Sequence, residues 1–150
     1  MTTQEIIDPC LRPLSEYERR VGENATTRLS KKAIESARYP RHWGEMADPD
    51  CTAQHRGSCG DVITYYLRLQ DERIRQIRFT TTGCDATYAA ANMLAAMVRG
   101  LSLQEAEKVS PEDLLEALEG LPPKHIHCAT LSVVTLQQAI QACRQKKAQP

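Results

Sequence analysis

The sequence predicts an α+β fold in which a small antiparallel β-sheet packs against several helices. Residues 62–69 alternate apolar and polar side chains, and a second short alternating run follows after a two-residue turn, as expected of a β-hairpin. On both sides of this hairpin the apolar residues recur at helical spacing instead. At 150 residues, 41% of them hydrophobic and 25% charged, the chain suits a single domain with one ordinary core.

The part of the chain before the hairpin is predicted to be helical and then irregular. Residues 1–12 should be loosely ordered, and a helical stretch should run from Leu14 to Arg38 with a break near Gly22. Residues 39–50 contain prolines, a glycine and aspartates, which favours a loop. The second half of the helical stretch has one apolar face, formed by Leu29, Ala33, Ile34 and Ala37.

The hairpin is predicted to consist of strands Val62–Leu69 and Ile74–Thr80, joined at Asp71-Glu72. The turn lacks glycine, so the sequence leaves its type open. An alanine-rich helix from Ala86 to Arg99 should follow and end at Gly100.

Two short helices and one long helix should complete the chain. Ser102 with Glu105 forms a capping box, and Ser110-Pro111 opens the next helix, which ends near Gly120. The last helix should run from about Cys128 to Lys146. Its apolar stripe contains Ala129, Val133, Leu136, Ile140 and Cys143.

Composition and charge exclude several classes of protein. The chain has 19 basic and 19 acidic residues, so a nucleic-acid partner is not expected. The most apolar stretch, residues 86–98, is too short to cross a bilayer, and the first residues lack a secretory signal. We therefore expect a cytoplasmic protein without a membrane partner.

Six cysteines need an explanation in such a chain. In a reducing compartment disulfides are rare, and cysteines are more often metal ligands, catalytic groups or buried apolar residues. The absence of a CxxC pair argues against an ordinary zinc ribbon. Cys10 should have no specific role, and Cys143 should fill the core. Cys51, near the Cys59 loop, is a candidate accessory thiol.

The other three cysteines lie where a structural element begins. Cys59 directly precedes the first hairpin strand, Cys84 lies between the second strand and the alanine-rich helix, and Cys128 begins the last helix. A helix N-terminus favours negative charge and hence the thiolate, which binds soft metals and attacks persulfides. Glycines beside Cys59 and Cys84 let a bulky ligand approach the backbone.

Asp61 and His127 stand beside two of these cysteines and supply an oxygen and a nitrogen ligand. Each has a simpler interpretation, as the cap of a turn or of a helix. Three thiolates with one weaker ligand can hold a [2Fe–2S] unit less tightly than four thiolates. An incomplete thiolate set suits a carrier that releases its cargo.

These residues resemble the signature sites of the U-type iron–sulfur scaffolds, the IscU/NifU N-terminal family. The resemblance lies in Cys59-Gly60-Asp61, Gly83-Cys84 and His127-Cys128, with 25 and 44 residues separating the cysteines. Residues 38–44 resemble the family's entry loop, and residues 100–106 resemble its Gly-Lys-Ser-Leu-x-Glu-Ala turn. The resemblance implies a SufE/NifU-like domain over residues 30–146, after a partly helical extension at 1–29.

The family resemblance also implies a role for each residue. Cys59, Cys84 and Cys128 would be cluster ligands and persulfide acceptors, and Asp61 would be an exchangeable ligand. His127 would be an alternative fourth ligand, or a ligand of Zn²⁺ in the cluster-free protein. The implied cluster would be [2Fe–2S] or [4Fe–4S], and the sequence leaves its type open. The protein would be a scaffold rather than an enzyme, with a cysteine desulfurase, an iron donor and apo iron–sulfur proteins as partners.

The sequence departs from the family at three places. Residues 121–125 read Leu-Pro-Pro-Lys-His where the family has Leu-Pro-Pro-Val-Lys, which argues against an Hsp70-type chaperone partner and makes His125 a candidate accessory group. Residues 50–56 are polar where relatives have a strand, so a third strand is expected to be shortened or lost. The long N-terminal stretch is a candidate for docking a partner or a second copy, giving a homo-oligomer.

Two other functions fit the same residues less well. A zinc-dependent sulfurtransferase of the SufU type would hold zinc on an aspartate and three cysteines and accept a persulfide. Such proteins usually carry an insertion between the second and third cysteine sites, and this chain lacks one. A purely structural zinc domain is weaker still, since paired CxxC knuckles are absent.

Overall fold

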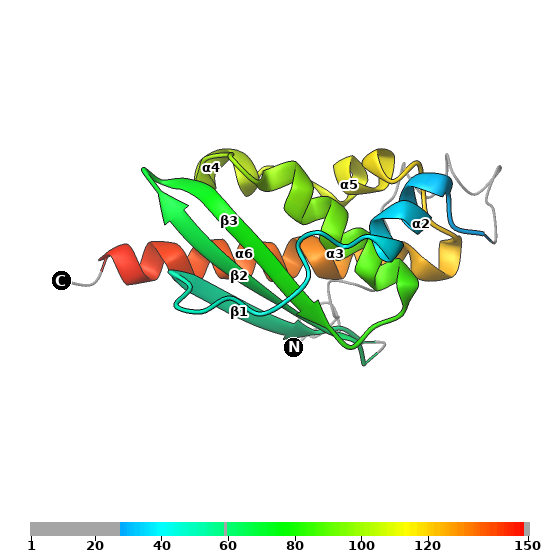
Figure 1. Ribbon diagram of the computed structural model, residues 1–150, viewed down its shortest axis with the longest axis horizontal. Coiled ribbons are helices and arrows are strands. Elements are labelled where there is room, and N and C mark those ends of the chain that lie inside the picture. The colour runs from blue at the N-terminus through cyan, green and yellow to red at the C-terminus, as the bar shows by residue number, and fades with distance from the viewer. Residues whose placement is uncertain (1–27, 59, 149–150) are drawn as a thin grey trace, which may run out of the picture.

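The computed structural model describes residues 28–58 and 60–148 (Figure 1). The predicted helical stretch before residue 28 lies outside the described residues, as do Cys10 and Cys59. Within the described part, no helix is both long and apolar enough to cross a lipid bilayer.

A three-stranded antiparallel sheet forms one layer of the fold, in the order β1-β2-β3. The strands are β1 (Cys51–Arg56), β2 (Val62–Gln70) and β3 (Arg73–Thr81), so the predicted hairpin is confirmed. Tyr65 pairs with Phe79, which puts their side chains on the same face of the sheet. The apolar residues of this inner face are buried: Ile63, Tyr65, Leu67, Ile77 and Phe79.

The third strand is present but short, so of the two expected outcomes the strand is shortened and not lost. Strand β1 has six residues against nine in each of β2 and β3. Its inward positions begin with Cys51 and Ala53, which face the core, while Thr52 and Gln54 face solvent. Period-two alternation is therefore preserved in β1 even though most of its side chains are polar.

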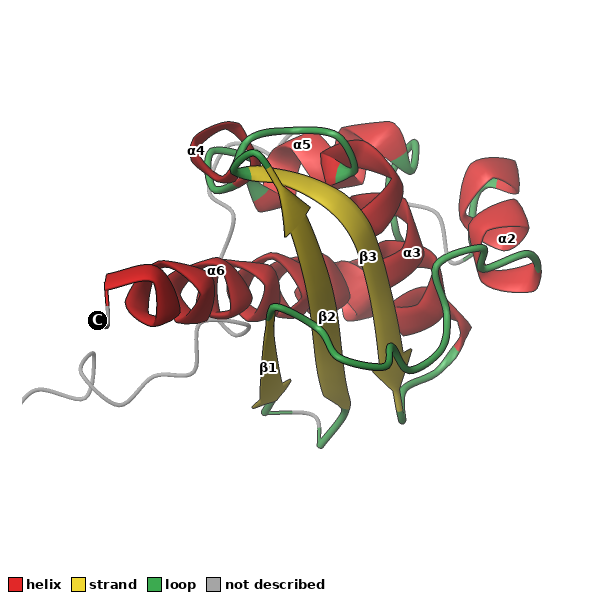
Figure 2. Ribbon diagram, turned by 60° about the vertical axis from the view of Figure 1, so that its left-hand side comes forward, coloured by secondary structure: helices red, strands yellow, loops and turns green. Residues whose placement is uncertain are grey.

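The helices lie on the inner face of the sheet, and the segment between α2 and β1 crosses part of its outer face (Figures 1 and 2). Helices α3 and α6 pack directly against the strands, and α2 packs on α3. Their bounds are α2 Lys31–Arg38, α3 Asp85–Val98, α4 Leu103–Ala106, α5 Pro111–Ala117, the 3₁₀ turn η3 Pro123–His125, and α6 Ile126–Ala148. The α+β prediction is thus confirmed.

Helix α2 turns most of its predicted apolar face inward, since Ala33 is buried and Leu29 and Ala37 pack against the core, but it departs from the prediction at Ile34 and Ser36. Ile34 is 37% exposed, whereas Ser36 is buried. The Ser36 hydroxyl donates a hydrogen bond to the Ala89 carbonyl and accepts one from the Asn92 side chain. Polar pairing with α3, which no hydrophobic pattern reveals, sets the orientation of α2.

Helix α6 begins earlier than the sequence predicted. It starts at Ile126, so Cys128 is its third residue and lies within its first turn. The turn η3 leads directly into it. The predicted apolar stripe of α6 is buried at every position, from Ala129 to Cys143.

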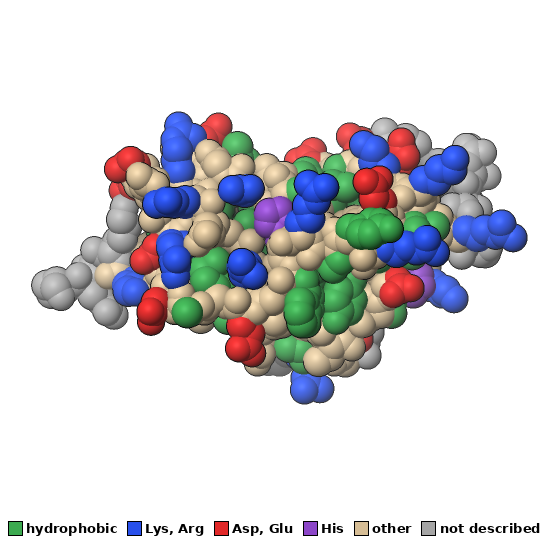
Figure 3. Space-filling model, in the orientation of Figure 1, with side chains coloured by type: hydrophobic (Ala, Val, Ile, Leu, Met, Phe, Trp, Pro, Cys, Tyr) green, Lys and Arg blue, Asp and Glu red, His purple; other side chains and the backbone are tan. Residues whose placement is uncertain are grey.

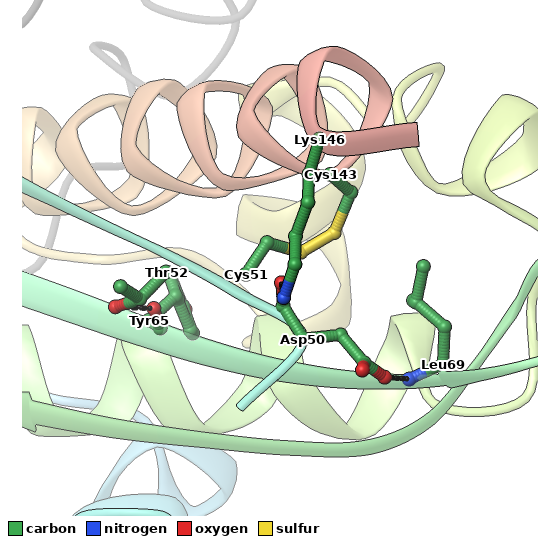
Figure 4. The surroundings of a disulfide bond; sticks show 7 residues. All are labelled: Asp50, Cys51, Thr52, Tyr65, Leu69, Cys143 and Lys146. Carbon is green, nitrogen blue, oxygen red and sulfur yellow. Dashed lines mark hydrogen bonds between the residues drawn. A yellow bond between two sulfur atoms is a disulfide. The ribbon is translucent and has the colours of Figure 1, made fainter. Parts of the chain in front are cut away.

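A disulfide bond joins Cys51 of β1 to Cys143 of α6, with 5.1 Å between their Cα atoms (Figure 4). Cys143 is buried, as a core residue should be, but it is not merely a filler. These two cysteines were not predicted to pair, since disulfides are rare in a reducing compartment. Spacing of 92 residues along the chain gave no signal for this pair, which only the packing of β1 on α6 brings together.

Candidate metal centre

Two of the predicted ligand segments meet where β2 begins and β3 ends. The Thr81 hydroxyl donates a hydrogen bond to the Val62 carbonyl over 2.7 Å. The Val62 N–H in turn donates to the Thr82 hydroxyl over 3.1 Å. These bonds tie the residue after Asp61 to the segment before Cys84, so both candidate ligands leave the same end of the sheet.

The loop between β1 and β2 is a tight turn that ends at Asp61. The Gly57 N–H donates to the Asp61 carbonyl over 2.8 Å, and the Gly60 N–H donates to the Gly57 carbonyl over 2.9 Å. Gly60 has φ +93°, a conformation that favours glycine, and a Cβ there would meet no atom within 4 Å. The turn is thus open on one side. Cys59 belongs to this loop but lies outside the described residues.

Cys84 is the N-cap residue of α3. Its carbonyl accepts the first hydrogen bonds of the helix, from the N–H groups of Thr87 (2.9 Å) and Tyr88 (3.0 Å). The thiol makes no capping hydrogen bond, and the residue is exposed. The backbone of Cys84 therefore organises the helix start, while its sulfur remains available to a ligand.

Cys128 approaches the same place from the first turn of α6, and it is buried, with 1% of its surface exposed. Its Sγ lies 3.8 Å from Nε2 of the partly buried His127. One candidate sulfur thus lies at the surface and another lies inside the protein.

The side chain of Thr87 connects these groups. Its hydroxyl donates a hydrogen bond to Oδ2 of Asp61 over 3.2 Å. The same oxygen lies 3.4 Å from Sγ of Cys128 and 3.9 Å from Sγ of Cys84. Thr87 is completely buried. Asp61, Cys84 and Cys128, which are far apart in the sequence, therefore surround a single hydroxyl group.

Gly83 makes the position of Thr87 possible. A Cβ atom at residue 83 would lie 2.4 Å from Oγ1 and 2.5 Å from Cβ of Thr87. Since real Cβ atoms do not approach other atoms so closely, any larger residue at position 83 would displace the first turn of α3.

The sequence did not single out Thr87. The available signal was its position three residues after Cys84 at the start of a helix, which places the two side chains on the same face. Polar character at a fully buried position was the second clue, but burial cannot be known before the fold.

His125 lies at the rim of this group. Partial burial lowers the pKa of its imidazole, and the positive charges of Lys124 and His127 lower it further, whereas the carboxylate of Asp61 opposes the effect. His125 therefore lies close enough to Asp61 and His127 for both groups to affect its pKa.

Cys51 does not belong to this site, and the expectation that it lies beside the Cys59 loop is wrong. Strand β1 runs from Cys51 to Arg56 before the loop begins, so Cys51 lies at the opposite end of the strand. Its sulfur is bonded to Cys143.

The donor chemistry of the site fits a soft metal ion with one hard ligand. Sulfur from Cys84 and Cys128 suits iron, zinc or an iron–sulfur unit, and a carboxylate binds such ions less tightly. Among the described residues alone, no three His, Cys, Asp or Glu side chains form a group that could hold a metal ion. Any thiolate from Cys59 would add to this set.

Comparison with known proteins gives consistent relatives. Residues 28–150 match the family model described as NifU-like N terminal domain. The chain is 36% identical over 112 residues to the iron–sulfur cluster assembly scaffold protein IscU 1 of Archaeoglobus fulgidus, covering 74% of this chain and 73% of that protein. It is 33% identical over 126 residues to IscU of Escherichia coli K12, covering 79% and 95%.

Solved structures show the same fold. A NifU-like N-terminal protein from Brucella abortus superposes with a TM-score of 0.60 at 21% identity, covering 77% of this chain and 94% of that one. A scaffold protein described for the SUF system of Fervidobacterium islandicum gives 0.63 at 19% identity, with 74% and 95% covered. With a family model matched over most of its length and two relatives above 30% identity, the chain belongs to the NifU-like N-terminal domain family.

Proposed function

We propose that this protein is an iron–sulfur cluster assembly scaffold that builds a labile [2Fe–2S] cluster and passes it to apo-proteins. The observation that supports this best is the convergence of Asp61, Cys84 and Cys128 on the Thr87 hydroxyl. Cys59 would complete the thiolate set, and His127 is the alternative to Asp61 as fourth ligand. The names of the relatives from A. fulgidus and E. coli agree with this role.

Sulfur would enter at the exposed cysteine. A persulfide on a cysteine desulfurase transfers its outer sulfur to an attacking thiolate, and the desulfurase cysteine leaves as a thiolate. Cys84 is exposed and Cys128 is buried, so only Cys84 of these two offers its sulfur to the active site of another protein. An iron donor would then supply the metal of the cargo.

The extent and location of the scaffold are part of the same proposal. Residues 30–146 would form the scaffold domain, and residues 1–29 would be an extension that docks a partner or a second copy of the chain. The protein would act in the cytoplasm, because the ligand cysteines must stay reduced to bind iron.

Anaerobic incubation of the full chain with ferrous iron, cysteine and a cysteine desulfurase tests the proposal. We expect a red-brown protein with the visible absorption of a [2Fe–2S] cluster, and a matched Cys84→Ala variant that fails to develop it. A colourless wild-type protein that holds one zinc ion tightly and accelerates the desulfurase would instead identify a zinc-dependent sulfurtransferase.

Replacement of Asp61 by alanine should lengthen the life of the cluster severalfold. A hard carboxylate is a poor partner for iron in a sulfur-rich set, and its exchange gives a recipient thiol its point of entry. The decay of visible absorption in the presence of a chelator measures the effect. Asp85→Ala, a change of one acidic residue in the first turn of α3, is the matched control. Faster decay in the Asp61→Ala protein would rule out Asp61 as the release ligand.

A further inference from the structure

The Cys51–Cys143 disulfide lies far from the candidate metal centre. It joins the first residue of β1 to the C-terminal half of α6. Fifteen residues of α6 separate Cys143 from Cys128, a helical distance of about 22 Å. Cys51 and Cys143 are not among the proposed cluster ligands. They are bonded to each other at the end of β1 and α6 that lies away from the candidate metal centre.

A pocket of about 370 Å³ opens beside this disulfide. Cys143 lines the pocket together with Leu69 and the charged residues Asp50, Asp71, Glu72 and Lys146. Lys146 extends from α6 past the disulfide and donates a hydrogen bond to the Asp50 carbonyl over 3.0 Å (Figure 4). Although both cysteines are buried, Cys143 is thus in reach of a small molecule, while Cys51 is not among the residues lining the pocket.

We propose that Cys51 and Cys143 form a redox-active pair that exchanges with small thiols through this pocket. A small thiolate attacks Sγ of Cys143, the Cys51–Cys143 bond breaks, and Cys51 leaves as a thiolate that takes a proton from water. A second small thiolate attacks the mixed disulfide and releases Cys143. Two thiols are oxidised to one small disulfide as the protein disulfide is reduced, and the same small disulfide drives the reverse reaction.

The charges of the pocket select the class of thiol. Three carboxylates and one ammonium group line it, so the local charge is negative. An anionic thiol such as glutathione is repelled, whereas a cationic thiol such as cysteamine is attracted, and salt weakens both effects.

The pair also fastens together two elements that carry the proposed cluster residues. The His55 ring of β1 contacts the Gln138 side chain of α6 over 3.2 Å. The disulfide joins the same two elements at the other end of β1. The loop with Asp61 follows β1, and Cys128 lies in the first turn of α6. Reduction removes the only covalent link between β1 and α6 that the described residues make, so both segments gain freedom to move.

Thiol mapping on the full, cluster-free chain tests the redox pair without relying on the scaffold function. The protein is equilibrated in buffers of increasing cysteamine-to-cystamine ratio, alkylated, and analysed by peptide mass spectrometry. We expect Cys51 and Cys143 to become alkylated together, at a single ratio, separately from Cys84. Alkylation of both in the most oxidising buffer, or protection of both in the most reducing one, would overturn the proposal.

Reduction rates test the role of the pocket. At low salt we expect cysteamine to reduce the pair about tenfold faster than glutathione, with the difference shrinking severalfold at high salt. Asp71→Asn should narrow the difference, and Glu35→Gln, which removes one negative charge from α2 instead, should leave it unchanged. Equal rates for both thiols in the wild-type protein would refute access through the acidic pocket.

Discussion

Thr87 contacts three of the candidate ligands, although its hydroxyl is itself a poor metal ligand when protonated. Its hydroxyl donates to Asp61 and lies against the sulfurs of Cys84 and Cys128. We infer that it is a positioning residue, which directs the Asp61 carboxylate toward the two sulfurs. A hydroxyl has only one proton to donate, so its bond to Asp61 fixes which group it orients.

Thr87→Val should release Asp61 and lengthen the life of a reconstituted cluster, as Asp61→Ala does but by a smaller factor. Valine has nearly the shape of threonine, so the change removes the hydroxyl and little else, at a cost of about 1 kcal/mol in folding free energy. Thr87→Ser keeps the hydroxyl and should restore the wild-type decay of visible absorption. Equal decay in the valine and serine proteins would show that the hydroxyl has no positioning role.

The sequence predicted most of the candidate site at the level of single residues. Asp61, Cys84 and Cys128 were recognisable because glycines and helix starts surround them. Thr87 was not, since its importance depends on burial between α3 and α6. Cys51 was predicted to lie near the Cys59 loop because the two are close in the sequence. The extended strand β1 runs between them and places Cys51 at the end of the strand away from the loop.

The β2–β3 turn has two consecutive non-glycine residues with positive φ. Asp71 and Glu72 have φ values of 54° and 63°, the left-handed conformation that a two-residue hairpin turn of type I′ requires. Glycine adopts this conformation without the steric cost that a Cβ atom imposes. The missing glycine left the turn type open in the sequence, and the structure shows that an acidic pair fills both positions.

Glu72→Gly should raise the free energy of unfolding by up to about 1 kcal/mol, because it removes the steric cost at the second turn position. Urea unfolding followed by circular dichroism measures the change. Glu72→Ala removes the same carboxylate but retains a Cβ atom, so it should give no stabilisation. If alanine stabilised the protein as much as glycine, loss of charge rather than backbone conformation would be the cause.

Elements governed by local chemistry were predicted accurately, and those governed by packing were not. The capping box at Ser102 and the helix start at Ser110 form as expected, and Ser110 makes a capping box as well, with Asp113, because all these hydrogen bonds lie within four residues. The start of α6 and the presence of β1 depend on contacts with distant parts of the chain. Their boundaries could not be read from local patterns.

Basic side chains spread over the outer face of the sheet (Figure 3). Arg41, Arg78 and Arg99 line a pocket with His42 beside β3. Burial lowers the pKa of His42, and the three arginines lower it further, while a hydrogen bond between its ring and the Ile77 carbonyl opposes this. His42 is therefore neutral in the folded protein at pH values where an unfolded chain already binds a proton.

Stability should consequently fall as the pH decreases from about 7.5 to 5.5, because the unfolded chain protonates His42 first. His42→Gln removes the titrating group and keeps a side-chain N–H for the Ile77 carbonyl, so its melting temperature should fall less over the same range. Thermal unfolding at several pH values measures both proteins. A variant with the same decrease as the wild type would assign the effect to other groups.

Cys84 is exposed and Cys128 is buried, and this difference in depth between the two candidate ligands sets the order in which a cluster would be released. A cluster bound between Cys84 and Cys128 would have one edge toward water and the other toward the core. A recipient can compete only at the outer edge, so the bond to Cys84 must break before the bond to Cys128. The bonds between the cluster and its ligands would break from the surface inward, and the bond to the buried Cys128 would break last.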